Sequence, residues 1–404
     1  RINKVKKIIK NVFRKLGIEI TRYTPNTRNL YEQVVSLKPR NKSKGNVLLS
    51  YILEPFLLKS GEPVPNTHNH YWRSLQMANT FLELGYSVDV IDYRNRKFIP
   101  KKNYAIFIDV RHNLERLSPF LNKDCLKIMY IDHAHILFHN FAEAKRLLEL
   151  QQRKGFTLRP RRFEVPNLGI EHADCATIAG NEFTLSTFRY ANKPIYRLPQ
   201  PCNVYPWSED KDYQMSSKSF LWFNSGGLVH KGLDLVLEAF AEMPDFHLYV
   251  CGPIQKEKDF EKVYHKELYE TANIHMIGWV DIDDSEFTEI TKKCLGVILA
   301  SCSEGGGASV ITCMHAGLIP IVSYESSVDV HDFGVILNDC SIDTIKKTVQ
   351  TISALPSEEL KNMARKAWEY ARANHTRERF SEEFKKVITH IIEMNCDKSY
   401  KPYK

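Results

Sequence analysis

Residues 304–322 read EGGGASVITCMHAGLIPIV, a glycine-rich turn followed by an apolar helical pattern and a short apolar run. Glycine is the weakest ordinary helix former, so three in succession are not expected to build the helix. They let the backbone lie close against a neighbour or a ligand. Since an apolar run at 295–300 precedes the turn, the stretch predicts strand, turn, helix and strand.

The same alternation extends outward through the chain and predicts an α/β fold with parallel sheets. A proline-rich linker at 198–219 separates two such series. We therefore expect two doubly wound, Rossmann-like domains facing a cleft, with ligands at the carboxyl ends of the strands. The expected organisation is a basic segment at 1–28, an acceptor domain at 45–200, a nucleotide-sugar domain at 215–375, and a helix at 376–404 that crosses back.

A second strand–helix junction lies at 223–240, FNSGGLVHKGLDLVLEAF. Ser225, Gly226 and Gly227 end the strand, and Lys231 precedes the helix. Exposed backbone N–H groups, a helix N-terminus and a lysine together favour a phosphate site. An ordinary tight turn is the alternative. At the first junction, Glu304 is placed to accept hydrogen bonds from sugar hydroxyls.

These stretches resemble the nucleotide-sugar domain of GT-B glycosyltransferases of the retaining family 4. The resemblance rests on GGLVHKGLDLVLEAF (226–240), HLYVCG (247–252), NIHMIGWV (273–280) and SCSEGGGASVITCMHAGLIPIVS (301–323). It is weaker in the first half, at GYSVDVIDY (85–93), MYIDHAH (129–135) and EHADCATIAGNEFTLSTF (171–188). It implies a retaining transfer of a hexose-type sugar from a nucleotide diphosphate sugar, without a metal or other cofactor.

The resemblance also implies roles for individual residues. Lys231 and Gly226 would hold the diphosphate, and Glu304 would contact the transferred sugar. The turn after Glu304 would meet the same sugar or the phosphate. The donor-binding set is therefore Ser225, Gly226, Gly227, Gly305, Gly306, Gly307 and Thr312, and the catalytic set is Glu304, Lys231 and His133.

Three departures from the family pattern weaken the expected donor site. Thr312 stands where the second glutamate of the E-x7-E motif grips the ribose, and Gly227 stands where an arginine contacts phosphate. The glycine pair that the family has in its first domain would fall near residues 68–69, where this sequence has His68 and Asn69. Arg73 or His230 would be alternative sources of the missing positive charge.

The stretch YIDHAHILFHN (130–140) follows a predicted strand and therefore falls at the cleft. His133 matches best the histidine that the family has near the donor sugar, whereas capping by Asp132 and His133 is the structural alternative. A metal on His135 and His139 is disfavoured because two histidines are a thin ligand set. Asp281 and Asp283 form a DxD pattern that we assign to helix N-capping.

The distribution of charge and the number of cysteines limit the classes of protein to which this chain can belong. The net charge of +8 is accounted for by residues 1–28, where nine basic side chains and one acidic side chain give nine minus one. A nucleic-acid binder would carry this charge on its folded body. Nine scattered cysteines fit a reducing compartment. A second basic stretch, 145–162, would face a membrane or form a solvated loop.

Residues 1–28 predict a basic amphipathic helix that lies on an anionic membrane. The alternative is a helix packed on its own domain with a solvated basic face. The expected protein is thus a cytoplasmic, peripheral membrane glycosyltransferase of surface polysaccharide or glycolipid synthesis, acting on a glycan or lipid-linked acceptor. The alternatives are a non-catalytic GT-B scaffold or sugar-binding partner protein, a sugar-nucleotide epimerase or phosphorolytic enzyme, and a periplasmic sugar-binding protein.

We predict that the full chain floats with liposomes containing anionic lipid and that a chain lacking residues 1–28 does not. High salt should release the full chain, because ions screen the attraction between lysines and headgroups. Density-gradient flotation measures both. Equal flotation of the two chains would contradict a membrane role for residues 1–28.

Overall fold

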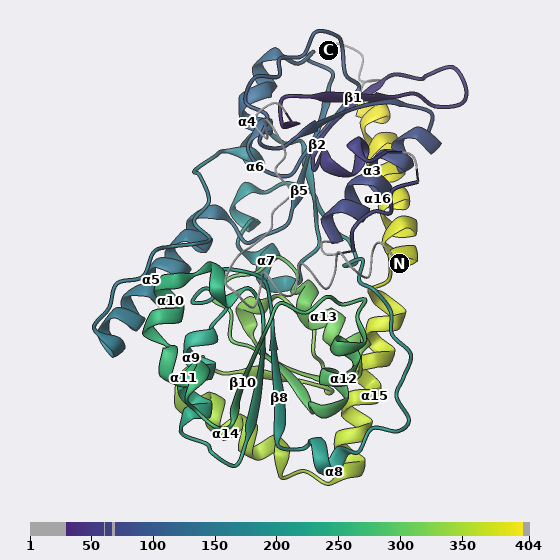
Figure 1. Cartoon of the computed structure of the whole chain (residues 1–404). Helices are drawn as coiled ribbons and strands as arrows, with labels where there is room; N and C mark the ends of the chain where they lie inside the picture. The colour runs from purple at the N-terminus through teal and green to yellow at the C-terminus, as the bar shows by residue number, and fades with distance from the viewer. Residues whose placement is uncertain (1–29, 60, 67–68, 399–404) are drawn as a thin grey trace.

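The computed structural model describes residues 30–59, 61–66 and 69–398, so the helix expected at 1–28 lies outside the described residues. Two parallel sheets, each flanked by helices, form an upper and a lower domain in Figure 1. The fold class expected from the sequence, two doubly wound α/β domains, is confirmed.

The N-terminal sheet has the strand order β1-β3-β2-β4-β5-β6-β7. Its strands β2 to β6 are almost entirely buried, as expected for parallel strands covered on both faces. Among the described strands only β1 runs antiparallel, and it forms the edge of the sheet beside β3. The strands are β1 (Val34–Leu37), β2 (Asn46–Tyr51), β3 (Ser87–Asp92), β4 (Ile106–Asp109), β5 (Leu126–Ile131), β6 (Cys175–Ile178) and β7 (Ile195–Arg197).

The C-terminal sheet has the order β10-β9-β8-β11-β12-β13, all parallel, which is the dinucleotide-fold order 3-2-1-4-5-6. The order reverses between β8 and β11, the two strands that precede the glycine turns. Its strands are β8 (Ser219–Phe223), β9 (His247–Cys251), β10 (Ile274–Gly278), β11 (Gly296–Leu299), β12 (Ile319–Ser323) and β13 (Val335–Leu337).

Helices cover both sheets (Figure 1). Those of the first half are α3 (Asn69–Glu83), α4 (Asn113–Leu117), α5 (Ile136–Lys154), α6 (Gly169–His172) and α7 (Glu182–Ser186). Those of the second half are α8 (Tyr213–Ser216), α9 (Leu233–Ala241), α10 (Lys258–Val263), α11 (His265–Tyr269), α12 (Ser285–Lys293), α13 (Ala308–His315), α14 (Ile342–Ser353), α15 (Ser357–Asn374) and α16 (Arg377–Lys398). Short 3-10 turns are η1 (Glu54–Leu57), η2 (Ser118–Phe120), η3 (Arg189–Ala191), η4 (Ile254–Lys256) and η5 (Tyr324–Ser326).

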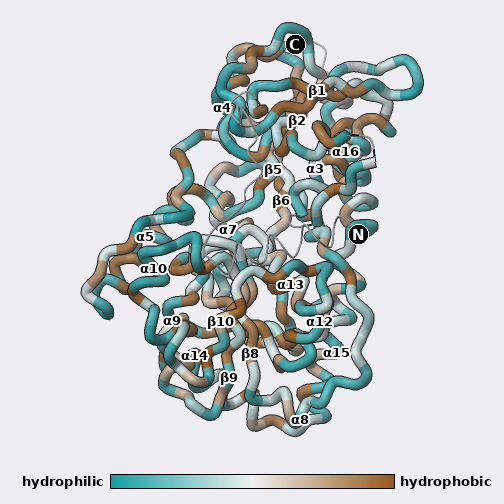
Figure 2. Tube along the Cα trace, in the orientation of Figure 1, coloured by the Kyte–Doolittle hydropathy of each residue, from teal (hydrophilic) through white to brown (hydrophobic). Residues whose placement is uncertain are grey.

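Helix α16 joins the core of the N-terminal domain. Phe380, Phe384 and Ile388 are fully buried among residues of β2 to β5 and α3. In Figure 1, α15 and α16 run one after the other along the edge of both domains. Figure 2 shows hydrophobic stretches at the centres of both domains, around β2 and β8, and hydrophilic residues along the outer helices.

Helix α5 and the loop that follows it form an arm from the N-terminal domain to the C-terminal domain, which we call the α5 arm (136–168). Leu150 and Leu158 are buried in the core of the C-terminal domain. Arg153 pairs with Asp234 of α9 at 2.6 Å, and Lys154 pairs with Glu267 of α11 at 2.8 Å. The α5 arm thus lies against α9–α11, as Figure 1 shows.

These pairs correct one expectation from the sequence. The basic stretch 145–162 is neither a free solvated loop nor a free basic face. Three of its basic residues, Arg153, Lys154 and Arg161, pair with acidic side chains of the C-terminal domain. The charges therefore join the two domains.

Candidate functional site

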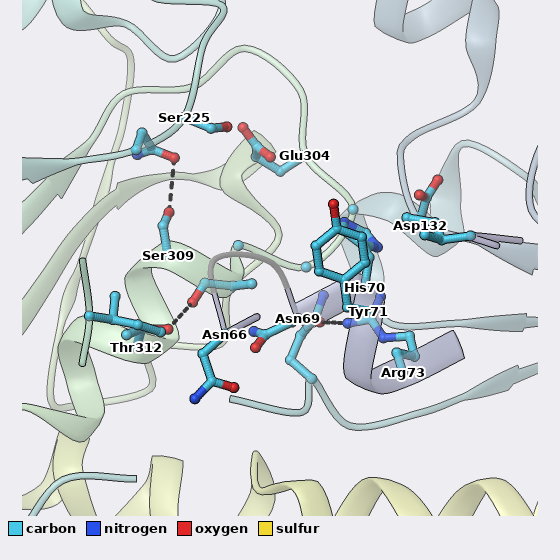
Figure 3. A pocket seen from close by; sticks show the side chains of 18 of the residues that line it. Asn66, Asn69, His70, Tyr71, Arg73, Asp132, Ser225, Glu304, Ser309 and Thr312 are labelled. Carbon is cyan, nitrogen blue, oxygen red and sulfur yellow. Dashed lines mark hydrogen bonds between the residues drawn. The ribbon is translucent and has the colours of Figure 1, made fainter. Parts of the chain in front are cut away.

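A cleft of about 440 Å³ lies between the two domains, at the carboxyl ends of both sheets. Strand–helix loops of the C-terminal domain form one wall, and α3 with the ends of β2, β4 and β5 forms the other. The first wall includes Ser225, Lys231, Glu304, Gly305, Gly306, Gly307, Ser309 and Thr312. The second includes Tyr51, His70, Arg73, Arg111 and Asp132, and several of these are labelled in Figure 3.

A buried ion pair occupies the C-terminal wall. Lys231 Nζ donates to Glu304 Oε1, and Ser301 Oγ donates to the same oxygen at 2.7 Å. The two charged side chains are 7% and 12% exposed, so the pair is almost dry yet lines the cleft. The two residues that the sequence predicts for phosphate and for sugar are thus brought together.

Burial and mutual attraction act in opposite directions on the pKa values of this pair. Burial raises the pKa of Glu304, but the charge and hydrogen bond of Lys231 outweigh burial and hold that pKa below its usual range. Burial lowers the pKa of Lys231, and the charge of Glu304 opposes the decrease. A substrate that competes for either group must therefore replace a strong charge-assisted hydrogen bond.

The glycine turn 305–307 makes its close approach to the N-terminal domain. A Cβ on Gly305 would overlap the carbonyl oxygen of Asp132, and one on Gly306 would overlap the side chain of Gln200. Gly307 has φ +49° and is the N-cap of α13. The first N–H groups of α13 have no partner within the helix, and Ala308 and Ser309 line the cleft. The turn therefore aims a helix N-terminus at the cleft.

The other glycine turn corrects a sequence expectation. The N–H of Gly227 and that of Leu228 donate to the carboxylate of Glu257, the latter at 3.3 Å. Neither Gly226 nor Gly227 is among the residues that line the cleft. Two backbone groups of the turn expected to bind phosphate are thus already satisfied by a carboxylate, and Asn224, Ser225 and Lys231 are the residues of this loop that reach the cleft wall.

His133 is also placed differently from the expectation. Its ring lines a small separate cavity beside His135 and Ile136 instead of the cleft, and its Nδ1 donates to the carbonyl of Ala134 at 2.6 Å. Burial lowers the pKa of His133 well below its usual range. Its neighbour Asp132 lines the cleft instead and pairs with Arg111 at 3.1 Å.

His133 is followed by two buried histidines, His139 and His230. The ring centroids of His133 and His139 are 5.4 Å apart, and those of His139 and His230 are 4.7 Å apart. His139 Nδ1 lies 3.0 Å from Ser303 Oγ and His139 Nε2 lies 2.8 Å from the carbonyl of Arg162. A neutral ring meets both needs, because Nε2–H donates to the carbonyl and Nδ1 accepts from the hydroxyl.

The sequence analysis also expected roles for His230, Thr312 and Arg73 at the donor site. His230 cannot supply the missing phosphate charge, because burial lowers its pKa well below the usual range and its Nε2 donates to the carbonyl of Ser303. Thr312 lines the cleft as expected, with its hydroxyl donating to the carbonyl of Ala308 at 2.8 Å. Arg73 lines the cleft and donates to Gln200 Oε1 at 2.6 Å.

The residues that the sequence analysis considered as metal ligands make other contacts in the structure. His135 caps α5 and contacts the hydroxyl of Tyr190 at 2.8 Å. Asp281 accepts from the N–H of Asp283, and the N-cap of α12 is Asp284, so the predicted capping by the DxD pair is wrong. Among the described residues, no group of three histidine, cysteine, aspartate or glutamate side chains could hold a metal ion. No described helix is long and apolar enough to cross a membrane.

Sequence reasoning assigned no site role to several cleft residues, among them Asp132, Ser309 and Arg162. Asp132 precedes His133, and Ser309 follows the glycine turn 305–307. Their position beside these assigned residues was the only indication in the sequence that they belong to the site. Arg162 belongs to a stretch that looked like a basic surface loop. The α5 arm brings it to the cleft.

Comparison with known proteins identifies the C-terminal domain. Residues 207–372 match the family model "Glycosyl transferases group 1". This match confirms the expected resemblance to glycosyltransferases over that segment, whereas the assignment to the retaining family 4 stays a prediction. A sequence search of curated proteins found no match.

Solved structures share the fold of the whole chain. Sucrose-phosphate synthase from Thermosynechococcus elongatus has a TM-score of 0.61 at 12% identity, with 88% of this chain and 100% of that chain covered. A glycosyltransferase from Rickettsia africae has a TM-score of 0.56 at 11% identity, with 87% and 99% covered. The Anabaena protein Alr3699/HepE in complex with UDP-glucose has a TM-score of 0.55 at 11% identity, with 86% and 100% covered.

The expected GT-B fold is confirmed by these likenesses. At such identities they concern the fold alone. The chain spans 57% of the length of a Staphylococcus aureus TarM variant, which it matches at 13% identity over 74% of its own residues with a TM-score of 0.49.

The buried histidines predict a loss of stability in mild acid. Burial lowers the pKa of His139 to about 4, so between pH 6.5 and pH 4 the unfolded chain binds a proton that the folded chain excludes. The stabilising contribution is therefore complete above pH 6.5 and falls as the pH falls. At pH 5.5 the loss from His139 alone should be about 1 kcal/mol. Urea unfolding midpoints at pH 7 and pH 5.5 measure this loss.

His139→Gln keeps a donor for the carbonyl of Arg162 but does not titrate. It should show a smaller decrease of the urea midpoint than the wild type over the same pH range. An equal decrease in both proteins would contradict the assignment of this pH dependence to His139.

Proposed function

We propose that this chain transfers a hexose-type sugar from a nucleotide diphosphate sugar to a glycan or lipid-linked acceptor, with retention at the anomeric carbon. The observation that carries the proposal is the dry Lys231–Glu304 pair in the cleft wall, next to the N-terminus of α13. The family match of residues 207–372 supports the reaction class. No metal or other cofactor is part of the proposal.

The reaction needs two electrostatic contributions. Cleavage of the bond between sugar and diphosphate leaves negative charge on the phosphate and an oxocarbenium-like sugar. Lys231 and the N–H groups at the start of α13 would stabilise the leaving diphosphate, because they are fixed donors at the cleft wall. The carboxylate of Glu304 would orient the sugar through its hydroxyls and leave its ion pair with Lys231 as the donor enters.

The opposite wall supplies groups for an acceptor. Tyr51 and His70 share a hydrogen bond at the cleft surface, and Asp132, a carboxylate paired with Arg111, lines the cleft beside them. Aromatic faces with a carboxylate suit a sugar, since they offer stacking surface and hydroxyl acceptors. We therefore propose that the acceptor binds against α3 and the end of β5.

The nucleotide of the donor is proposed from the fold. The Anabaena protein of similar fold was solved with UDP-glucose. UDP is therefore the first nucleotide to test, although a likeness in fold at 11% identity does not fix the base.

A membrane location is part of the proposal, cytoplasmic and peripheral, with residues 1–28 on an anionic surface. One feature of the described residues supports it. Leu137, Phe141 and Leu148 share one face of α5 and are 73%, 67% and 58% exposed. Exposed apolar side chains gathered in this way mark interaction surfaces. A lipid-linked acceptor of surface polysaccharide or glycolipid synthesis would suit such a location.

A non-catalytic GT-B scaffold is the second candidate. Glu257 favours it, because this carboxylate occupies the backbone groups of the Gly227 turn that would otherwise hold phosphate. A scaffold would keep the fold but bind no nucleotide sugar.

Thermal unfolding with UDP, GDP, ADP, dTDP and CMP, and with their common sugar conjugates, separates the two candidates. For a transferase we expect one nucleotide to stabilise the protein by about 2.7 kcal/mol at a hundred times its dissociation constant. The corresponding nucleoside monophosphate or free sugar is the control. No stabilisation by any of these compounds would favour the scaffold.

Glu304→Gln should lower transfer on the order of a hundredfold, because the amide keeps the shape but not the charge that orients the sugar. Lys231→Met should lower it by at least as much, because it removes the cation from the diphosphate. Sugar transfer is measured with the donor that the thermal scan selects. Ser309→Ala, in the same wall, is the matched control. Wild-type turnover in both of the first two variants would exclude this assignment.

A further inference from the structure

Arg162 reaches the cleft from the other domain. It lies in the α5 arm, yet it lines the cleft together with Lys231 and Glu304. A Cβ built on Gly227 would lie 2.5 Å from Arg162 Cγ and 2.8 Å from Arg162 Cδ. The aliphatic stem of Arg162 therefore fills the space that a side chain at position 227 would need.

The guanidinium of Arg162 forms no direct ion pair within the part of the chain that the structure describes, and its charge acts only at longer range on the carboxylates of Glu304 and Glu143. Its Nε is buried without a hydrogen-bond partner, and no carboxylate forms an ion pair with its guanidinium. The adjacent Arg161, in contrast, pairs with Asp259 and Glu257. Arg111, in the opposite wall, pairs with Asp132 and Glu164. A buried guanidinium nitrogen without a hydrogen-bond partner is costly unless an anion arrives beside it.

The backbone of Arg162 is fixed on both sides. Its N–H donates to the buried carboxylate of Glu143 at 3.0 Å, and its carbonyl accepts from His139 Nε2 at 2.8 Å. The other nitrogen of His139 accepts from the hydroxyl of Ser303, the residue before Glu304. These bonds place the guanidinium beside the Lys231–Glu304 pair, and its charge lowers the pKa values of both members.

We propose that Arg162 is a second cation for the donor diphosphate, delivered to the site by the opposite domain. This inference rests on the proposed function, since it assigns a residue to the same donor site. A guanidinium can hold two phosphate oxygens in parallel, which a lysine cannot. Lys231 is neutralised by Glu304 until a donor enters, so Arg162 is the cation that meets the incoming diphosphate.

The test compares a nucleoside diphosphate with its monophosphate. Calorimetric titration of UDP and UMP into the full chain gives both dissociation constants for wild type and for Arg162→Met, which keeps the aliphatic stem over Gly227. We expect Arg162→Met to weaken UDP about tenfold to a hundredfold. UMP binding should change far less. Arg162→Lys should fall between the wild type and Arg162→Met for UDP.

Arg161→Met is the matched control, because it removes the neighbouring cation of the same arm. It should leave the ratio of UDP to UMP affinity as in the wild type. Unchanged UDP binding in Arg162→Met, or an equal loss for UDP and UMP, would overturn the proposal and leave Arg162 as a packing residue. If the wild type prefers another base, the di- and monophosphate of that nucleoside replace UDP and UMP.

The outcomes for this inference and for the proposed function are separable. A wild-type chain that binds no nucleoside diphosphate contradicts the proposed function. A wild-type chain that binds UDP, with Arg162→Met equally good, contradicts only the role of Arg162. Thermal unfolding without ligand checks that each variant is folded.

Discussion

The glycine turn after β11 sets how closely the two sheets approach. Its first two residues lie against the carbonyl of Asp132 and the side chain of Gln200, where no Cβ would fit. This contact closes one end of the cleft and turns the N-terminus of α13 toward it. It also brings Glu304, the residue before the turn, next to Lys231. A bulkier turn would separate the domains and, with them, every pair of groups that faces across the cleft.

The ion pair at this place is not explained by stability. Removing two charges from water costs several kcal/mol, and their attraction does not generally return more than that. Both side chains nevertheless line the cleft. A pair with this cost at a cleft wall is better understood as groups held ready for a ligand, each neutralising the other in its absence. The neutral histidines behind it add hydrogen bonds without adding charge.

The local patterns of the sequence predicted much of this molecule, and its long-range contacts account for the rest. The apolar runs that alternate with helical patterns predicted β2 to β6 and β8 to β12, because strands buried on both faces consist of consecutive apolar residues. The helical pattern after β9 is divided into α10 and α11, which meet at Tyr264, and the hydroxyl of Tyr264 donates to Glu238 of α9. Lys231 and Glu304 were predicted as site residues from their turns. The roles of Glu257, which occupies the Gly227 turn, and of Arg162, which packs on it, depend on contacts between segments distant in sequence.

The α5 arm makes the chain less modular than its two sheets suggest. The family match begins at residue 207, yet the hydrophobic core of that domain includes Leu150 and Leu158, which belong to the preceding half. A donor domain cut out at the linker would therefore lose part of its interior and the ion pairs of α9 and α11. Recombination with a homologue would need to carry the arm together with the domain on which it packs. The two halves have to be inherited, expressed and engineered as one unit.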